Sequence, residues 1–181
     1  IVFADNQAVE QTNDWSFTVT YLDLDPATRY AGPGPERGLR VRVVQAPQEG
    51  GLLENSLARA ESQLAANSPI PKVYDLTQTR PVINFSQNAP FGSAGYFGDD
   101  LEIPGASEEF GTDNYALEAL AFLELPAGIV RFGVRSDDGY KLATAVNPSA
   151  ATPPLEFHNG GPADEVFDVV VHQAGVYAFR L

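Results

Sequence analysis

The fold of this chain is decided by one stretch, GIVRFGVRSDDGYKL, which occupies residues 128–142. In this stretch Val130, Phe132 and Val134 alternate with polar or small residues, and a period of two is typical of a strand with one buried face. Ser-Asp-Asp-Gly then interrupts the alternation at residues 136–139. Because Asp-Gly between two alternating runs favours a tight turn, the stretch predicts a β-hairpin whose return strand runs on to Val146.

Alternating segments recur on both sides of this stretch. Further strands are expected at residues 15–21, 39–43, 72–76, 82–85, 115–125, 166–171 and 176–181. Residues 115–125 are rich in helix-forming residues, but their apolar side chains fall on one strand face, so we expect a strand there as well. Together these segments predict an all-β fold, an antiparallel β-sandwich.

One short helix is expected near residues 53–65. Apolar residues recur there at spacings of four, three and four, from Leu53 to Leu64. Asn55 or Ser56 can cap the first turn, and the prolines at positions 69 and 71 prevent the helix from continuing. We expect this helix to pack against an edge of the sheet.

The composition excludes several classes of site and partner. The chain has no cysteine, so disulfides, zinc-thiolate sites and cysteine nucleophiles are impossible. The 24 acidic residues against 11 basic ones give a net charge of −13, which repels nucleic-acid phosphates and anionic lipid. We therefore expect no nucleic-acid binding and, without a long apolar run, no membrane insertion. High acidity with few lysines favours an exported protein.

Asp137 and Asp138 are the main candidate metal ligands. Calcium takes about six to eight oxygen ligands, from carboxylates, backbone carbonyls and water. Two adjacent carboxylates at a rigid turn supply part of such a set, and Gly139 allows the backbone to approach a ligand. Asp and Gly are also the residues that tight turns prefer, so a purely structural turn stays an alternative.

Other groups that bear on a sugar ligand are weaker candidates. Other acidic pairs include Asp23 with Asp25, Asp99 with Asp100, and Glu108 with Glu109, each interpreted more readily as a solvated turn. Two carboxyls that face a sugar at a set separation can hydrolyse a glycosidic bond, but the sequence does not show that separation. Phe91 and Tyr96 are candidates for stacking on a sugar ring, although burial is the commoner fate of aromatic side chains.

Nucleophilic hydrolysis is not indicated. The chain has two histidines, His158 and His172, and no Gly-x-Ser-x-Gly motif. His172 is interpreted as a histidine at the surface or at a sheet edge. In the turn at residues 158–161, the side-chain amide of Asn159 is a candidate ligand-binding group.

The stretch 128–142 resembles part of the protective-antigen-type β-sandwich domain, a family that is named for an anthrax toxin fragment and includes yeast flocculins and bacterial adhesin modules. The shared motif is a Gly-led strand that runs into Ser-Asp-Asp-Gly. Residues 122–128 and 175–181 also resemble segments of this family, in the same order. The resemblance covers residues 80–181 and implies that residues 1–79 form an N-terminal extension, which holds strands and the helix and packs on the sandwich.

In the lectin-like members of this family, paired aspartates bind one calcium ion, which in turn coordinates sugar hydroxyls. The resemblance implies that Asp137 and Asp138 are such ligands. With Gly139 and Asn159 as ligand-binding residues, we expect a non-catalytic, calcium-dependent carbohydrate-binding or adhesion module, extracellular or at the cell surface, with a glycan as partner. A structural or self-assembling surface subunit that binds neither calcium nor sugar, and an accessory domain of a glycoside hydrolase, stay open.

The chain ends inside the alternating segment 176–181, and in the family further calcium ligands follow the equivalent strand. We therefore expect a sandwich that lacks its final strand. Such an ending would leave an open sheet edge, to be completed by further chain or by another copy of the protein.

Overall fold

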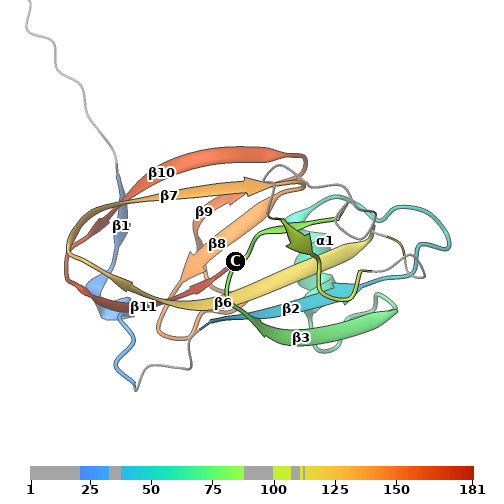
Figure 1. The fold of residues 1–181 in the computed structure, drawn as a ribbon, viewed down its shortest axis with the longest axis horizontal. Coiled ribbons are helices and arrows are strands. Elements are labelled where there is room, and N and C mark those ends of the chain that lie inside the picture. The colour runs from blue at the N-terminus through green and yellow to red at the C-terminus, as the bar shows by residue number, and fades with distance from the viewer. Residues whose placement is uncertain (1–20, 33–37, 88–99, 107–110, 112) are drawn as a thin grey trace, which may run out of the picture.

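The alternating segments form strands of stacked sheets in a computed structural model, which describes residues 21–32, 38–87, 100–106, 111 and 113–181 (Figure 1). The elements are β1 (Leu22–Leu24), the 3-10 helix η1 (Pro26–Thr28), β2 (Leu39–Gln45), α1 (Leu57–Leu64), β3 (Tyr74–Arg80), β4 (Phe85–Ser86), β5 (Leu101–Glu102), β6 (Tyr115–Leu125), β7 (Gly128–Ser136), β8 (Tyr140–Thr144), β9 (Pro154–His158), β10 (Ala163–Val171) and β11 (Gly175–Arg180). The expected strand at 15–21 lies outside the described residues except for Tyr21.

The strands are arranged in two main layers. One is a three-stranded sheet in the order β1-β10-β7, and the other is a six-stranded sheet in the order β3-β2-β6-β11-β8-β9. All neighbours in the six-stranded sheet are antiparallel, whereas β1 runs parallel to β10. A small sheet of β4 and β5 completes the described strands. The expected all-β sandwich with one short helix is confirmed.

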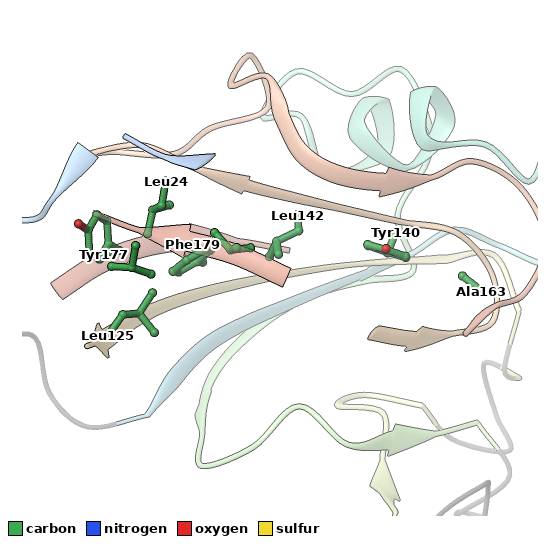
Figure 2. Close-up of a cluster of buried hydrophobic side chains, with 9 residues drawn as sticks. Leu24, Leu125, Tyr140, Leu142, Ala163, Tyr177 and Phe179 are labelled. Atoms are coloured by element: carbon green, nitrogen blue, oxygen red, sulfur yellow. The ribbon is translucent and has the colours of Figure 1, made fainter. Parts of the chain in front are cut away.

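The core lies between the two layers, where alternate residues of facing strands meet. It is a cluster of Leu24, Leu125, Tyr140, Leu142, Ala163, Val169, Val171, Tyr177 and Phe179. Figure 2 shows these side chains in a row, from Leu24 and Tyr177 at one end to Tyr140 and Ala163 at the other. Phe132 of β7 stacks on Phe167 of β10, with ring centroids 5.8 Å apart, and also contacts Phe179. This burial of apolar surface stabilises the stacking of the sheets.

Helix α1 covers the other face of the six-stranded sheet. Leu64 packs there against Val44 and Ala116. The helix begins after Ser56 rather than at Leu53, because the Ser56 hydroxyl accepts a hydrogen bond from the backbone N–H of Arg59 at 3.2 Å and so caps the first turn. Of the two expected candidates, Asn55 and Ser56, it is therefore Ser56 that forms the N-cap.

Two expectations about strand pairing are wrong. Strands β7 and β8 do not form a hairpin, because β7 pairs with β10 in one sheet while β8 pairs with β9 and β11 in the other. Strand β11 lies inside its sheet between β6 and β8, so it does not form the open sheet edge that was expected there. Alternation reports which face of a strand is buried, but it does not report the neighbouring strand.

The expected division after residue 79 stays a prediction. Strand β3 spans that position, and β2 pairs with β6 over residues 40–45. The early strands β2 and β3 therefore extend the same sheet that the later strands build.

Candidate functional site

The Asp137–Asp138 turn connects the two layers of the sandwich. It leaves β7 at Ser136 in the three-stranded sheet and enters β8 at Tyr140 in the six-stranded sheet. Both aspartates are exposed, and the peptide bond between them is cis. The turn therefore presents two carboxyl groups at the end of the sandwich where the chain crosses between sheets.

The carboxyl group of Asp138 influences the ionisation of Asp137. The pKa of Asp137 is raised above its ordinary value by partial burial, by its hydrogen bond with the Asp138 carboxyl and by the negative charge of Asp138. Each of these effects opposes having two negative charges side by side. A cation between the carboxylates would relieve this repulsion, so the two groups fit the anionic part of a calcium ligand set.

Gly139 is required for the contact between this turn and the β9 end. A Cβ atom added at Gly139 would collide with the carbonyl oxygen of His158 and would lie 3.0 Å from the backbone nitrogen of Gly160. Tyr140 and His158 are register partners in the β8–β9 ladder, which holds the two segments together. The structure thereby brings the 137–139 turn and the 158–160 turn side by side.

Asn159 lies in this second turn, and its side chain is directed to α1. Its Oδ1 atom accepts a hydrogen bond of 2.8 Å from the backbone N–H of Leu57, the first residue of the helix. This bond satisfies one of the N–H groups that a helix N-terminus leaves without an intrahelical partner. Asn159 therefore ties α1 to the turn that contacts Gly139.

Arg59 and Tyr115 are within the electrostatic influence of the carboxyl pair, and no sequence motif marks either residue. Arg59 donates hydrogen bonds to the carbonyl oxygens of Glu54 (2.8 Å) and Tyr115 (3.1 Å). Burial lowers its pKa, and the charge of Asp138 acts in the opposite direction. Burial together with the charges of Asp138 and Asp137 raises the pKa of the Tyr115 hydroxyl to about 12. The guanidinium of Arg59 carries a permanent positive charge, which would repel a metal ion bound at the carboxyl pair.

A second polar cluster bridges the two sheets at the His158 position. The Tyr140 hydroxyl donates to Glu165 Oε2 at 2.6 Å, and His158 Nδ1 lies 3.0 Å from Glu165 Oε1. Burial and the neighbouring Glu165 raise the pKa of Tyr140. No sequence signal links these residues, because Glu165 comes from β10 and the other two from the opposite sheet.

The remaining acidic candidates have structural roles or lie elsewhere. The Asp25 carboxylate caps η1 by accepting the Ala27 N–H at 2.8 Å, and Asp23 pairs with His172, whose ring is exposed as expected. Asp99, Glu108, Glu109, Phe91 and Tyr96 lie outside the described residues. Within the described part of the chain, no group of three or more His, Cys, Asp or Glu side chains is placed to hold a metal ion. A metal ion at Asp137 and Asp138 would therefore need its other oxygen ligands from backbone, water or a bound ligand.

Comparisons with known proteins provide no relative from which a function could be transferred. No protein-family model matches the chain, and the searches of curated proteins and of solved structures also find no match. None of the described helices is long and apolar enough to span a membrane.

Proposed function

We propose that this protein is a non-catalytic binding module in which Asp137 and Asp138 hold a calcium ion that contacts the hydroxyls of a carbohydrate. The observation that carries the proposal is the placement of two exposed, adjacent carboxyl groups on the turn that crosses between the sheets. Burial and then the neighbouring Asp138 raise the pKa of Asp137, which is consistent with a site that favours a cation. The resemblance of residues 128–142 to the protective-antigen-type domain supports the same assignment of these two aspartates.

In this proposal some residues bind the ion and others form its surroundings. Asp137 and Asp138 would supply anionic oxygens, and Gly139 would keep their turn against the 158–160 turn. Asn159, tied to α1 through Leu57, would set one wall of the ligand position. Calcium would act as a bridge that polarises neighbouring sugar hydroxyls and leaves covalent bonds intact. The proposal places the module outside the cell or at its surface.

The first test is calorimetric titration of the metal-stripped protein with calcium chloride. We expect binding at micromolar to millimolar strength, which Asp137→Asn/Asp138→Asn abolishes. The matched variant Glu49→Gln/Glu124→Gln removes two negative charges from exposed positions elsewhere and should retain binding. Because the pKa of Asp137 is raised, protonation should weaken calcium binding at a higher pH than for an isolated aspartate. Titrations between pH 7 and pH 4 measure this dependence.

Absence of calcium binding by the native protein would contradict the proposal, as would equal binding by the aspartate variant. If calcium binds as expected, a glycan array probed with calcium and then with EDTA tests the second half of the proposal. Sugar binding that EDTA abolishes would support the role of the ion as a bridge.

A further inference from the structure

The outward face of the three-stranded sheet carries an ordered pattern of charge and shape. We call this surface the β7–β10 face. It is made of Ile129, Arg131, Gly133 and Arg135 of β7 and Val170, Asp168, Val166 and Asp164 of β10. The alternate residues of the same strands, among them Phe132 and Val169, point into the core, so these eight positions face away from it. Each β7 residue is the register partner of one β10 residue, in the order given.

Each strand of this face carries charges of one sign. Strand β7 carries the two arginines and β10 the two aspartates. Arg131 pairs with Asp168 at 2.8 Å, and Arg135 pairs with Asp164 at 3.0 Å. The Arg131 and Asp164 side chains are each 71% exposed, so they have room to reach a second molecule. The face carries no net charge in these four residues, although the whole chain carries −13.

Between the two ion pairs, an exposed apolar side chain lies next to a position that has no side chain. Val166 is 65% exposed, and its register partner is Gly133, which has no side chain. The fold does not require glycine at this position: its backbone is not in the left-handed region, and an added Cβ would make only ordinary contacts, at 3.8 Å, with the Glu165 carbonyl oxygen and Val166. Further along, Ile129 is 58% exposed opposite Val170. The face therefore carries two large exposed apolar side chains, one on each side of the Arg131–Asp168 pair.

This pattern is complementary to itself. A two-fold axis that runs between β7 and β10, parallel to both and in the plane of contact, places β7 of one copy over β10 of the other. Because register partners lie at the same height along this axis, each residue then faces its register partner on the other molecule. Arg131 faces Asp168, Arg135 faces Asp164, Val166 faces the gap at Gly133, and Ile129 faces Val170.

We infer that the β7–β10 face is the contact surface of a homodimer, with a second copy of this chain as the occupant. Arginine facing aspartate in both halves specifies the two-fold arrangement, and Val166 fitting over Gly133 allows the two sheets to approach closely. Strands β7 and β10 are nine residues long each. With about 3.4 Å per residue and about 4.8 Å between strands, their contact area is small. We therefore expect a weak dimer, with a dissociation constant of about 10–500 μM.

This dimer has a consequence for the Asp137–Asp138 turn. The axis is parallel to β7, and the turn directly follows β7, so both copies present their turns at the same end of the dimer. Two weak sites at one end would bind a repeating ligand with increased avidity. The dimer itself needs neither calcium nor sugar.

The test is sedimentation equilibrium of the full chain between about 1 μM and 1 mM, in EDTA and about 0.15 M salt so that long-range repulsion is screened. We expect the native protein to dimerise. Arg131→Asp/Arg135→Asp makes the charged positions of both strands negative, and Asp164→Arg/Asp168→Arg makes them positive. Each variant alone should dimerise at least about tenfold more weakly, whereas an equimolar mixture of the two should form a heterodimer because opposite charges then face each other.

Two further variants separate the contact from general effects of charge and stability. Arg40→Asp/Lys72→Asp makes the same change in net charge at β2 and ahead of β3, and it should leave dimerisation unchanged. Gly133→Val fills the gap and favours the strand, so it should weaken the dimer without lowering the melting temperature. A native protein that stays monomeric at 1 mM overturns the inference. So does a mixture of folded charge variants that forms no heterodimer, or a Gly133→Val protein that dimerises like the native one.

Discussion

Gly139 contacts the backbone of another turn at a distance that leaves no room for a side chain. The carbonyl oxygen of His158 and the backbone of Gly160 occupy the place where a Cβ atom would be. Its backbone is not in the left-handed region, so the glycine is required by close packing and not by the conformation of the turn. The expected role of Gly139 in letting the backbone approach a ligand stays a prediction.

A pair of alanine substitutions tests this role. Gly139→Ala should lower the free energy of unfolding by about 1–3 kcal/mol, because the methyl group forces the 158–160 backbone away. Gly161→Ala is the matched control, since an added Cβ there meets nothing within 4 Å. Urea unfolding of both variants measures the difference. Equal stability of the two proteins would contradict the packing role of Gly139.

Helix α1 is held on the six-stranded sheet by charges as well as by apolar contacts. The guanidinium of Arg180, which is only 4% exposed, donates to both carboxylate oxygens of Glu61, at 2.7 and 2.6 Å, and to Glu118 at 2.8 Å. Lys141 also pairs with Glu61, at 3.2 Å. Burial alone would raise the pKa of Glu61, but the hydrogen bonds and charges of Arg180 and Lys141 outweigh it and lower the pKa. The helix is thus anchored to β11, β8 and, through Glu118, β6.

Loss of this anchor should loosen the helix. Glu61→Gln removes the charge between Arg180 and Lys141 and should lower the free energy of unfolding by about 1–3 kcal/mol at pH 7. Because the pKa of Glu61 is lowered from 4.5 on folding, its contribution is complete above that value and is lost as the pH falls through the lowered pKa. The difference between native protein and variant should therefore shrink below about pH 4.

Denaturant unfolding at several pH values measures this effect, and hydrogen exchange of the α1 amides locates it. Glu54→Gln is the control, since Glu54 is exposed just before the helix. A pH-independent difference, or an equal effect of the control, would show that Glu61 does not act through its charge.

At the scale of the whole molecule, the two sheets are joined at one end by polar contacts. Tyr140 and His158 of the six-stranded sheet both reach Glu165 of the three-stranded sheet. Figure 2 shows Tyr140 with Ala163 at one end of the buried row, away from Tyr177. This contact lies beside the turn that holds Asp137 and Asp138, so it restrains the spacing of the sheets where the chain crosses between them.

A double-mutant cycle tests whether this contact joins the layers. Tyr140→Phe should lower the melting temperature by about 3 °C, because the phenol loses a short hydrogen bond to a carboxylate. Once Glu165→Gln has removed the carboxylate, the same change should cost less. Thermal unfolding of the four proteins gives the coupling. Strictly additive effects would mean that the two residues act independently.

The sequence by itself determined the class of fold and most of its elements. Alternation at 115–125 and 128–136 predicted β6 and β7, and the 166–171 and 176–181 segments correspond to β10 and β11. These assignments depend on local periodicity, which burial of one strand face imposes on each segment separately. The acidic residues of the candidate site were also visible, because Ser-Asp-Asp-Gly is a local motif.

Only the tertiary structure determined which strands pair with each other and which side chains come into contact. The structure shows that residues 136–139 cross between the sheets and that α1 brings Arg59 near Asp138. Both arrangements depend on pairings between segments far apart in the chain. The complementarity of the β7–β10 face likewise appears only when Gly133 is placed opposite Val166. The period of a strand is the same whichever neighbour it pairs with, so the choice of neighbour is made by packing of the whole core.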